Sequence, residues 1–95
     1  MIQFKDLIFK DNLRGTNAHH KFDNNWEISV AAGKMAYSTP REDGLDSSAY
    51  SSFEIAIFNP EGHYATSEVL QIDDDVAGWQ GIEDINNIIE MIANQ

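Results

Sequence analysis

The 95-residue chain has no cysteine and only two prolines. Without cysteine it forms no disulfide, and it has no thiolate for a zinc site or for nucleophilic catalysis. Because secreted domains of this size are usually stabilised by disulfides, the absence favours an intracellular, cytoplasmic protein. Charged residues interrupt the apolar N-terminal segment at Lys5, Asp6, Lys10 and Asp11. We therefore expect neither a signal peptide nor a membrane span.

Basic residues are few, and all six lie before residue 42. The first 41 residues hold these six bases and four acids, a net charge of +2, whereas residues 42–95 hold twelve acids and no base, a net charge of −12. A one-signed segment raises repulsion within the fold, which mixed surfaces avoid. Two explanations stay open: the acids keep the protein soluble, or they attract a basic partner.

Motifs that identify a reaction are also missing. The chain has no G-x-S-x-G nucleophile elbow, no G-x-x-x-x-G-K phosphate loop, no G-x-G-x-x-G dinucleotide motif and no H-E-x-x-H metalloprotease motif. Carboxylates are so abundant that two of them side by side do not by themselves indicate catalysis. We therefore predict a protein without catalytic residues, without a cofactor and without enzymatic activity.

Two clusters have part of what a metal site needs. Counted from Asp73, the calcium-loop pattern places Ala77 at position five, where an oxygen ligand is needed, and Asp84 at position twelve, where glutamate is usual. His19 and His20 are adjacent, and neighbouring side chains of a strand point to opposite faces. Helix capping, a solvated acidic corner and ordinary strand histidines explain both clusters, so we predict no metal site.

Short runs rich in β-branched and aromatic residues predict an antiparallel sheet. Trp26, Ile28 and Val30 fall on one face of an alternating run, so we expect Trp26 in the core, whereas Trp79 is assigned to neither core nor surface. The sequence predicts strands at 2–9, 18–22, 26–32, 53–59 and 63–72, a loop at 10–17, and an extended run from Met35 to Tyr37.

The C-terminal residues predict an amphipathic helix. Ile82, Ile85, Ile89 and Ile92 recur at intervals of three and four, which places them on one helical face, and Ile88 and Met91 widen this stripe. We expect a helical turn over residues 73–79 before it. The predicted fold is α+β, in one domain over residues 1–95: an antiparallel sheet of four to five strands with one C-terminal helix packed on one face. The other sheet face is left to solvent or to a partner.

Residues 39–52 form the longest break in these patterns, with one proline, one glycine and four serines. A connection of this length is uncommon in a small domain and often has a function. Asp46 is a candidate cap for a short helical turn that reaches Tyr50. An aromatic residue in a polar loop is hard to explain by core packing, so Tyr50 is the predicted anchor for a partner.

The acidic positions between Glu42 and Glu90, above all Asp73, Asp74 and Asp75, carry a resemblance at the level of a protein class. In these residues the chain resembles the small acidic single-domain inhibitors that phages encode against host defence, including anti-CRISPR proteins and nucleic-acid mimics. The resemblance implies an inhibitor or adaptor that binds a basic, nucleic-acid-binding host protein or complex. It extends over about half of the chain, and the slightly basic first 41 residues depart from it.

The predicted partner is a protein, because direct binding of nucleic acid requires basic residues on one face. We expect a monomer or a homodimer. Two alternatives are kept: an assembly protein that self-associates through its sheet, and a module that binds a small ligand or cation in residues 73–84 or in the long loop. The predicted partner-binding residues are Glu42, Asp43, Asp46, Tyr50, Glu68, Asp73, Asp74, Asp75, Glu83 and Asp84.

Overall fold

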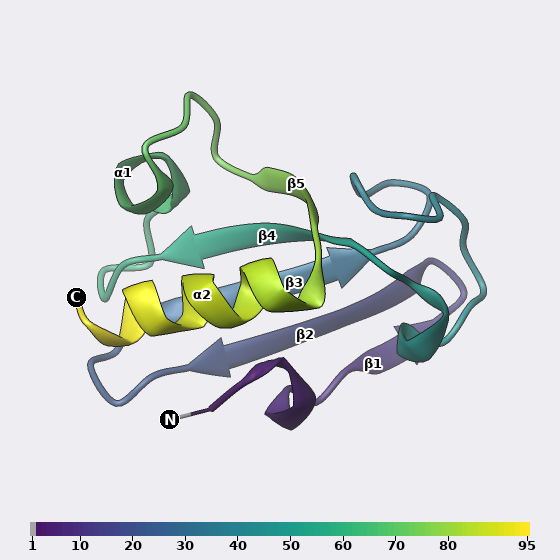
Figure 1. Cartoon of the computed structure of the whole chain (residues 1–95), viewed down its shortest axis with the longest axis horizontal. Helices are drawn as coiled ribbons and strands as arrows, with labels where there is room; N and C mark the ends of the chain where they lie inside the picture. Colours follow the sequence, from purple (N-terminus) through teal and green to yellow (C-terminus); the bar gives the residue numbers. More distant parts are fainter. Residues whose placement is uncertain (1) are drawn as a thin grey trace.

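The computed structural model describes residues 2–95 and has the predicted α+β fold. Five strands form one antiparallel sheet, and neighbours in the sheet follow the order of the chain (Figure 1). The strands are β1 (Lys10–Asn12), β2 (Gly15–Lys21), β3 (Glu27–Ala32), β4 (Phe53–Phe58) and β5 (Ala77–Gln80). The helices are α1 (Thr66–Leu70), α2 (Ile82–Ala93) and the 3-10 turns η1 (Phe4–Asp6) and η2 (Ser47–Ala49).

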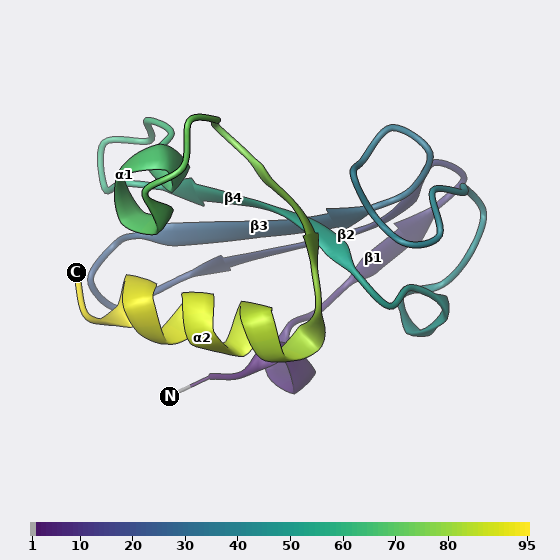
Figure 2. The same ribbon diagram turned by 45° about the horizontal axis from the view of Figure 1, so that its top comes forward.

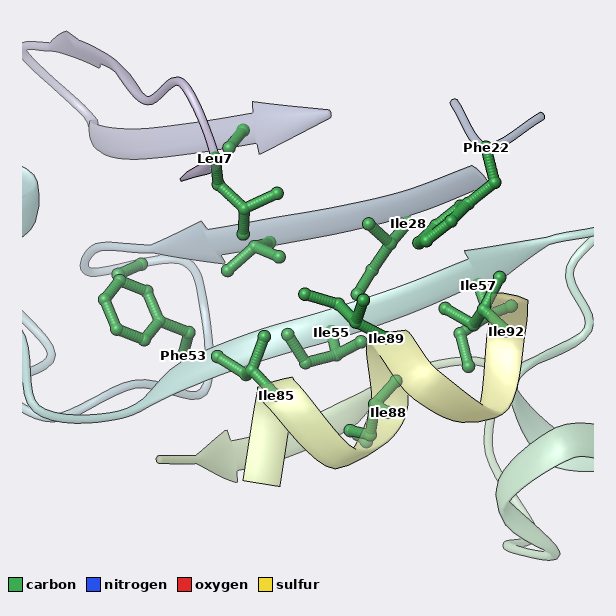
Figure 3. Close-up of a cluster of buried hydrophobic side chains, with 14 of the residues drawn as sticks. Leu7, Phe22, Ile28, Phe53, Ile55, Ile57, Ile85, Ile88, Ile89 and Ile92 are labelled. Atoms are coloured by element: carbon green, nitrogen blue, oxygen red, sulfur yellow. The ribbon is translucent and has the colours of Figure 1, made fainter. Parts of the chain in front are cut away.

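The core lies between α2 and one face of the sheet. Alternation along β3 and β4 places Val30 opposite Ile55 and Ile28 opposite Ile57, and all four side chains are fully buried. Ile82 and Met91, predicted on the same stripe, are 49% and 41% exposed. The other four isoleucines of α2 pack onto the sheet, as predicted from their spacing (Figure 3). Each such side chain contributes about 1.5–3 kcal/mol through burial. The buried isoleucines of α2 are Ile85, Ile88, Ile89 and Ile92.

The opposite face of the sheet carries mainly small and polar side chains. Figure 2 shows α2 on one side of the sheet only. The residues that alternate with the core positions point to the other side, among them Ser29, Ala31 and Glu54. Small and charged side chains in this register do not form a second core. We call this surface the open face.

The turns after β2 and after β4 contain residues that such turns favour. In the β2–β3 connection, the Phe22 N–H donates to the carbonyl of Trp26 at 2.8 Å, and Asn25 takes a φ of 71°, which asparagine tolerates. Trp26 is partly buried and packs against the core, rather than within it as expected. After β4, the Gly62 N–H donates to the Asn59 carbonyl at 2.9 Å and closes a four-residue turn.

The predicted strand over residues 2–9 is wrong. The segment contains η1 instead, and its aromatic side chains cover the end of the core: the rings of Phe4 and Phe9 lie 5.2 and 5.6 Å from the ring of Phe53. The Phe4 N–H donates to Oδ1 of Asn86 on α2 at 2.7 Å. The apolar residues here therefore serve packing, not strand pairing. The predicted loop at 10–17 is also wrong, because it holds β1 and the start of β2.

Residues 63–72 do not form the predicted return strand. Tyr64 makes one bridge to Phe58, and the chain then turns into α1. The buried hydroxyl of Thr66 accepts the Ile57 N–H at 2.8 Å, so a side chain takes the place of a strand partner. The helix ends at Gln71, which has a φ of 56°.

Residues 73–79 do not form the predicted helical turn, because β5 begins at Ala77 and pairs with β4. The extended run from Met35 to Tyr37 is wrong as well. There, the Ala36 N–H donates to the Gly33 carbonyl at 3.2 Å and makes a turn. Both predictions missed pairings that depend on distant segments: β5 needs β4, and this turn is fixed when Oε1 of Glu54 accepts the Tyr37 N–H at 3.3 Å.

Candidate functional site

The strand order converts the uneven charge of the sequence into an uneven charge in space. Because sheet neighbours follow chain order, residues 2–41 build β1 to β3 and residues 42–95 build β4, β5, α1 and α2. The basic positions Lys10 and Arg14 thus belong to the β1 side of the sheet, and half of the acids of residues 42–95 lie on the segments next to β5 in the chain. A fold with crossed connections would have mixed the two halves.

Six of the predicted partner-binding acids belong to elements that adjoin the edge strand β5. All six are exposed, and we call them the acidic edge. Within residues 2–95, the one contact between an acidic and a basic side chain is that of His19 with Glu27 at 3.3 Å, so no lysine or arginine pairs with the acidic edge. Its field is therefore available to a partner. The acidic edge consists of Glu68 on α1, Asp73, Asp74 and Asp75 in the next loop, and Glu83 and Asp84 on α2.

The acidic edge has a shallow hollow at the loop between α1 and β5. Ser67 and the three consecutive aspartates line a space of about 330 Å³. In the part of the chain that the structure describes, no group of three or more metal-ligating side chains is placed to hold a metal ion. Oδ2 of Asp84 accepts the Gly81 N–H at 3.0 Å and so caps α2. The edge thus provides an extended charged surface.

The other three predicted acids lie in the β3–β4 connection, at the end of the sheet away from α1 (Figure 1). Oδ1 of Asp43 accepts the Lys34 N–H at 2.7 Å. Asp46 caps η2, as predicted, and accepts the Ser48 N–H at 2.9 Å. Hydrogen bonds from Ser48, first from its side chain, lower the pKa of Asp46. These two carboxylates, with Glu42 beside them, therefore belong to the loop's own structure and not to the acidic edge.

The prediction that Tyr50 is an exposed anchor is wrong. Its side chain is 4% exposed and packs in the core, and its hydroxyl donates to the Glu42 carbonyl. Burial, followed by the charges of Asp43 and Glu42, raises the pKa of Tyr50 above its usual value. The residue ties the long loop to the core, which explains an aromatic residue among serines.

Sequence reasoning missed the aromatic pair that does lie on the surface. The rings of Tyr37 and Trp79 are 5.1 Å apart at an interplanar angle of 34°, and the two residues are 42% and 58% exposed. The guanidinium of Arg41 lies over the Tyr37 ring, 5.1 Å from its centre. We call Tyr37 and Trp79 the aromatic corner. Glu54, which points to the open face, accepts the Tyr37 N–H and so places the aromatic corner on that side. Because Tyr37 and Trp79 belong to segments that are distant in the sequence, no local pattern shows the contact between them.

No family model, curated protein or solved structure matches this chain. No helix in the described part of the chain has the length and hydropathy needed to cross a membrane.

Proposed function

We propose that this chain is a protein-binding inhibitor or adaptor that docks its acidic edge on the basic, nucleic-acid-binding surface of another protein. In this it acts like the phage anti-defence inhibitors that its acidic half resembles. The partner's lysines and arginines take the place of the bases that the acidic edge lacks. Nucleic acid and the chain then compete for one surface, which is the source of inhibition.

One observation carries the proposal: the chain-order sheet gathers unpaired acids beside β5. A one-signed surface speeds the encounter with a partner of opposite sign and selects against acidic partners. Solubility requires net charge but not its concentration on one side. Concentrated charge thus supports a directed contact more than a general solubilising role.

Charge reversal tests the proposal. The affinity-tagged chain is used to capture proteins from a nuclease-treated bacterial host lysate at about 0.1 M and 0.5 M salt. We expect a dominant basic partner at low salt and its loss at high salt, because screening weakens exposed charge pairs. The triple variant Asp73→Lys, Asp74→Lys, Asp75→Lys loses this partner.

The matched control reverses three exposed acids outside the acidic edge: Asp23, Glu61 and Glu90. It changes the net charge by the same amount and is expected to retain most of the partner. If both triple variants retain the partner equally at low salt, only the net charge matters. If the edge variant alone retains the partner, the contact lies outside the acidic edge. Either result contradicts the proposed function.

A second candidate function, self-association through the sheet, is favoured by the exposed aromatics near the open face: Tyr37, Tyr64 and Trp79. Face-to-face sheet packing buries such side chains. It predicts a dimer mass in sedimentation equilibrium at about 0.5 mM that Trp79→Asn returns to the monomer. A monomer of the native chain at that concentration contradicts it.

A further inference from the structure

The edge strand β5 contains a bulge, and the stability of the fold does not by itself explain its geometry. Phe53 pairs with Gln80 and Ile55 with Ala77, so two residues of β5 lie opposite Glu54. One of them, Trp79, has a φ of 53°, in the left-handed region that bulky residues avoid. Its ring is nevertheless more exposed than buried. A strained backbone that presents a large apolar ring to solvent is typical of a binding position.

The ring of Trp79 is held in place by its neighbours. The Trp79 N–H donates to the Tyr37 carbonyl at 2.9 Å, and the two rings stack. Gly78 allows this approach, because a β-carbon built there would meet Cβ of Tyr37 at 2.7 Å. The aromatic corner is therefore a preformed surface and loses little entropy when a partner binds.

The chain itself shows which chemistry the aromatic corner accepts. Arg41 places its guanidinium over the Tyr37 ring, while its Nε–H donates to the Lys34 carbonyl at 3.2 Å. Guanidinium groups stack on tyrosine and tryptophan faces more readily than ammonium groups do, because they are planar and weakly hydrated. The Trp79 ring is the part of the corner that this intramolecular contact leaves exposed.

Charge complementarity identifies the occupant. Asp75 is four residues before Trp79, about 13 Å along an extended chain, so a single basic segment can reach both the acidic edge and the corner. We infer that the aromatic corner of Tyr37 and Trp79 receives an arginine side chain of the basic partner, as the anchor of the contact that the acidic edge attracts. This inference rests on the proposed function and names the residue type that the partner contributes.

Two peptides test the inference on the full-length chain: hexaarginine and hexalysine, which carry equal charge. Binding is followed through the indole N–H resonances of the isotopically labelled protein, with Trp26 as internal reference. We expect hexaarginine to shift the Trp79 resonance and to bind about two- to fivefold more tightly than hexalysine, the factor that an exposed cation–π contact provides. The Trp26 resonance is expected to stay in place.

Three variants locate the preference. Trp79→Asn removes the ring and keeps the left-handed backbone, which asparagine tolerates, and Gly78→Ala displaces Tyr37 without changing any charge. Both are expected to bind the two peptides equally. Arg41→Ala frees the Tyr37 ring and is expected to bind hexaarginine more tightly than Arg14→Ala, a control that removes an exposed arginine with the same charge.

Three results would each overturn the inference. The native chain could bind the two peptides with equal affinity, it could bind neither at about 1 mM, or the preference for hexaarginine could survive in Trp79→Asn. The proposed function is judged separately, by capture of the partner with the charge-reversal variants. Loss of the partner in the edge variant together with equal peptide affinities would leave the acidic edge in place and reject the aromatic corner.

Discussion

At the scale of single residues, Gly15 makes the closest approach to a neighbouring strand among the glycines. It starts β2 with a φ of 111°, and a β-carbon there would lie 2.1 Å from the Ala32 carbonyl oxygen. Gly15→Ala must therefore move the β2–β3 pairing as well as accept an unfavourable φ. We expect the free energy of unfolding, measured in urea, to fall by more than about 2 kcal/mol.

Gly44→Ala is the control for this prediction, because Gly44 has a φ of 78° but no atom within 4 Å of the added carbon. It carries only the backbone cost, about 1–2 kcal/mol. If the two variants lose the same free energy, the close contact between β2 and β3 does not contribute.

Tyr50 gives the fold a pH dependence in the alkaline range. Its pKa is raised in the folded state, above the ordinary value of 10.0, so the unfolded chain releases this proton at a lower pH than the folded chain. The free energy of unfolding is therefore unaffected by this ionisation well below pH 10, and it falls as the pH rises toward the pKa of Tyr50 in the folded state. Comparing Tyr50→Phe with the native chain between pH 8 and pH 11 isolates the effect. The difference in free energy of unfolding should shift in favour of the variant above pH 10, and a constant difference would contradict the assignment.

At the scale of elements, α2 holds the sheet together through one face. Ile89 is fully buried at its centre, whereas Met91 is exposed two residues later. Ile89→Ala leaves a cavity between α2 and the sheet and is expected to lower the free energy of unfolding by about 2–5 kcal/mol. Met91→Ala on the same helix should cost less than about 1 kcal/mol. Similar losses in a urea titration would mean that this face of α2 is not the core.

Elements whose pattern is local could be predicted from the sequence, and elements that depend on distant partners could not. The helix over Ile82–Ala93 and the strand over Phe53–Phe58 repeat their apolar residues at the right period. By contrast, Ile2 to Phe9 has the composition of a strand, but its phenylalanines pack on Phe53 and Asn86 accepts the Phe4 N–H. Likewise, α1 replaces a strand because the Thr66 hydroxyl accepts the free N–H of Ile57.

The candidate site was predictable in its charge but not in its geometry. The sequence singled out all six acids of the acidic edge, and the structure shows that they lie on segments next to β5, from α1 to the first turn of α2. Nothing local distinguishes these acids from Glu42, Asp43 and Asp46, whose loop lies at the other end of the sheet. The burial of Tyr50 and the exposure of Trp79 follow from contacts with the core and with Tyr37, which are far away in the sequence.

At the scale of the whole molecule, the chain-order sheet places the six acids of the acidic edge on the segments that precede and follow β5. No lysine or arginine of residues 2–95 pairs with them, whereas the other three predicted acids lie in the β3–β4 connection. In the proposed function, this surface replaces the charge of a nucleic-acid backbone on the partner. The expected partner therefore uses the same groove for nucleic acid and for this chain.

The most direct test is displacement. A labelled oligonucleotide is bound to the purified partner, and the native chain is titrated in at about 0.1 M salt while fluorescence anisotropy reports the bound fraction. We expect the native chain to release the oligonucleotide. The variant with Asp73, Asp74 and Asp75 changed to lysine should need at least a tenfold higher concentration for the same release. The control with Asp23, Glu61 and Glu90 changed to lysine should behave like the native chain. Binding of the chain to the partner while the oligonucleotide stays bound would contradict the central claim.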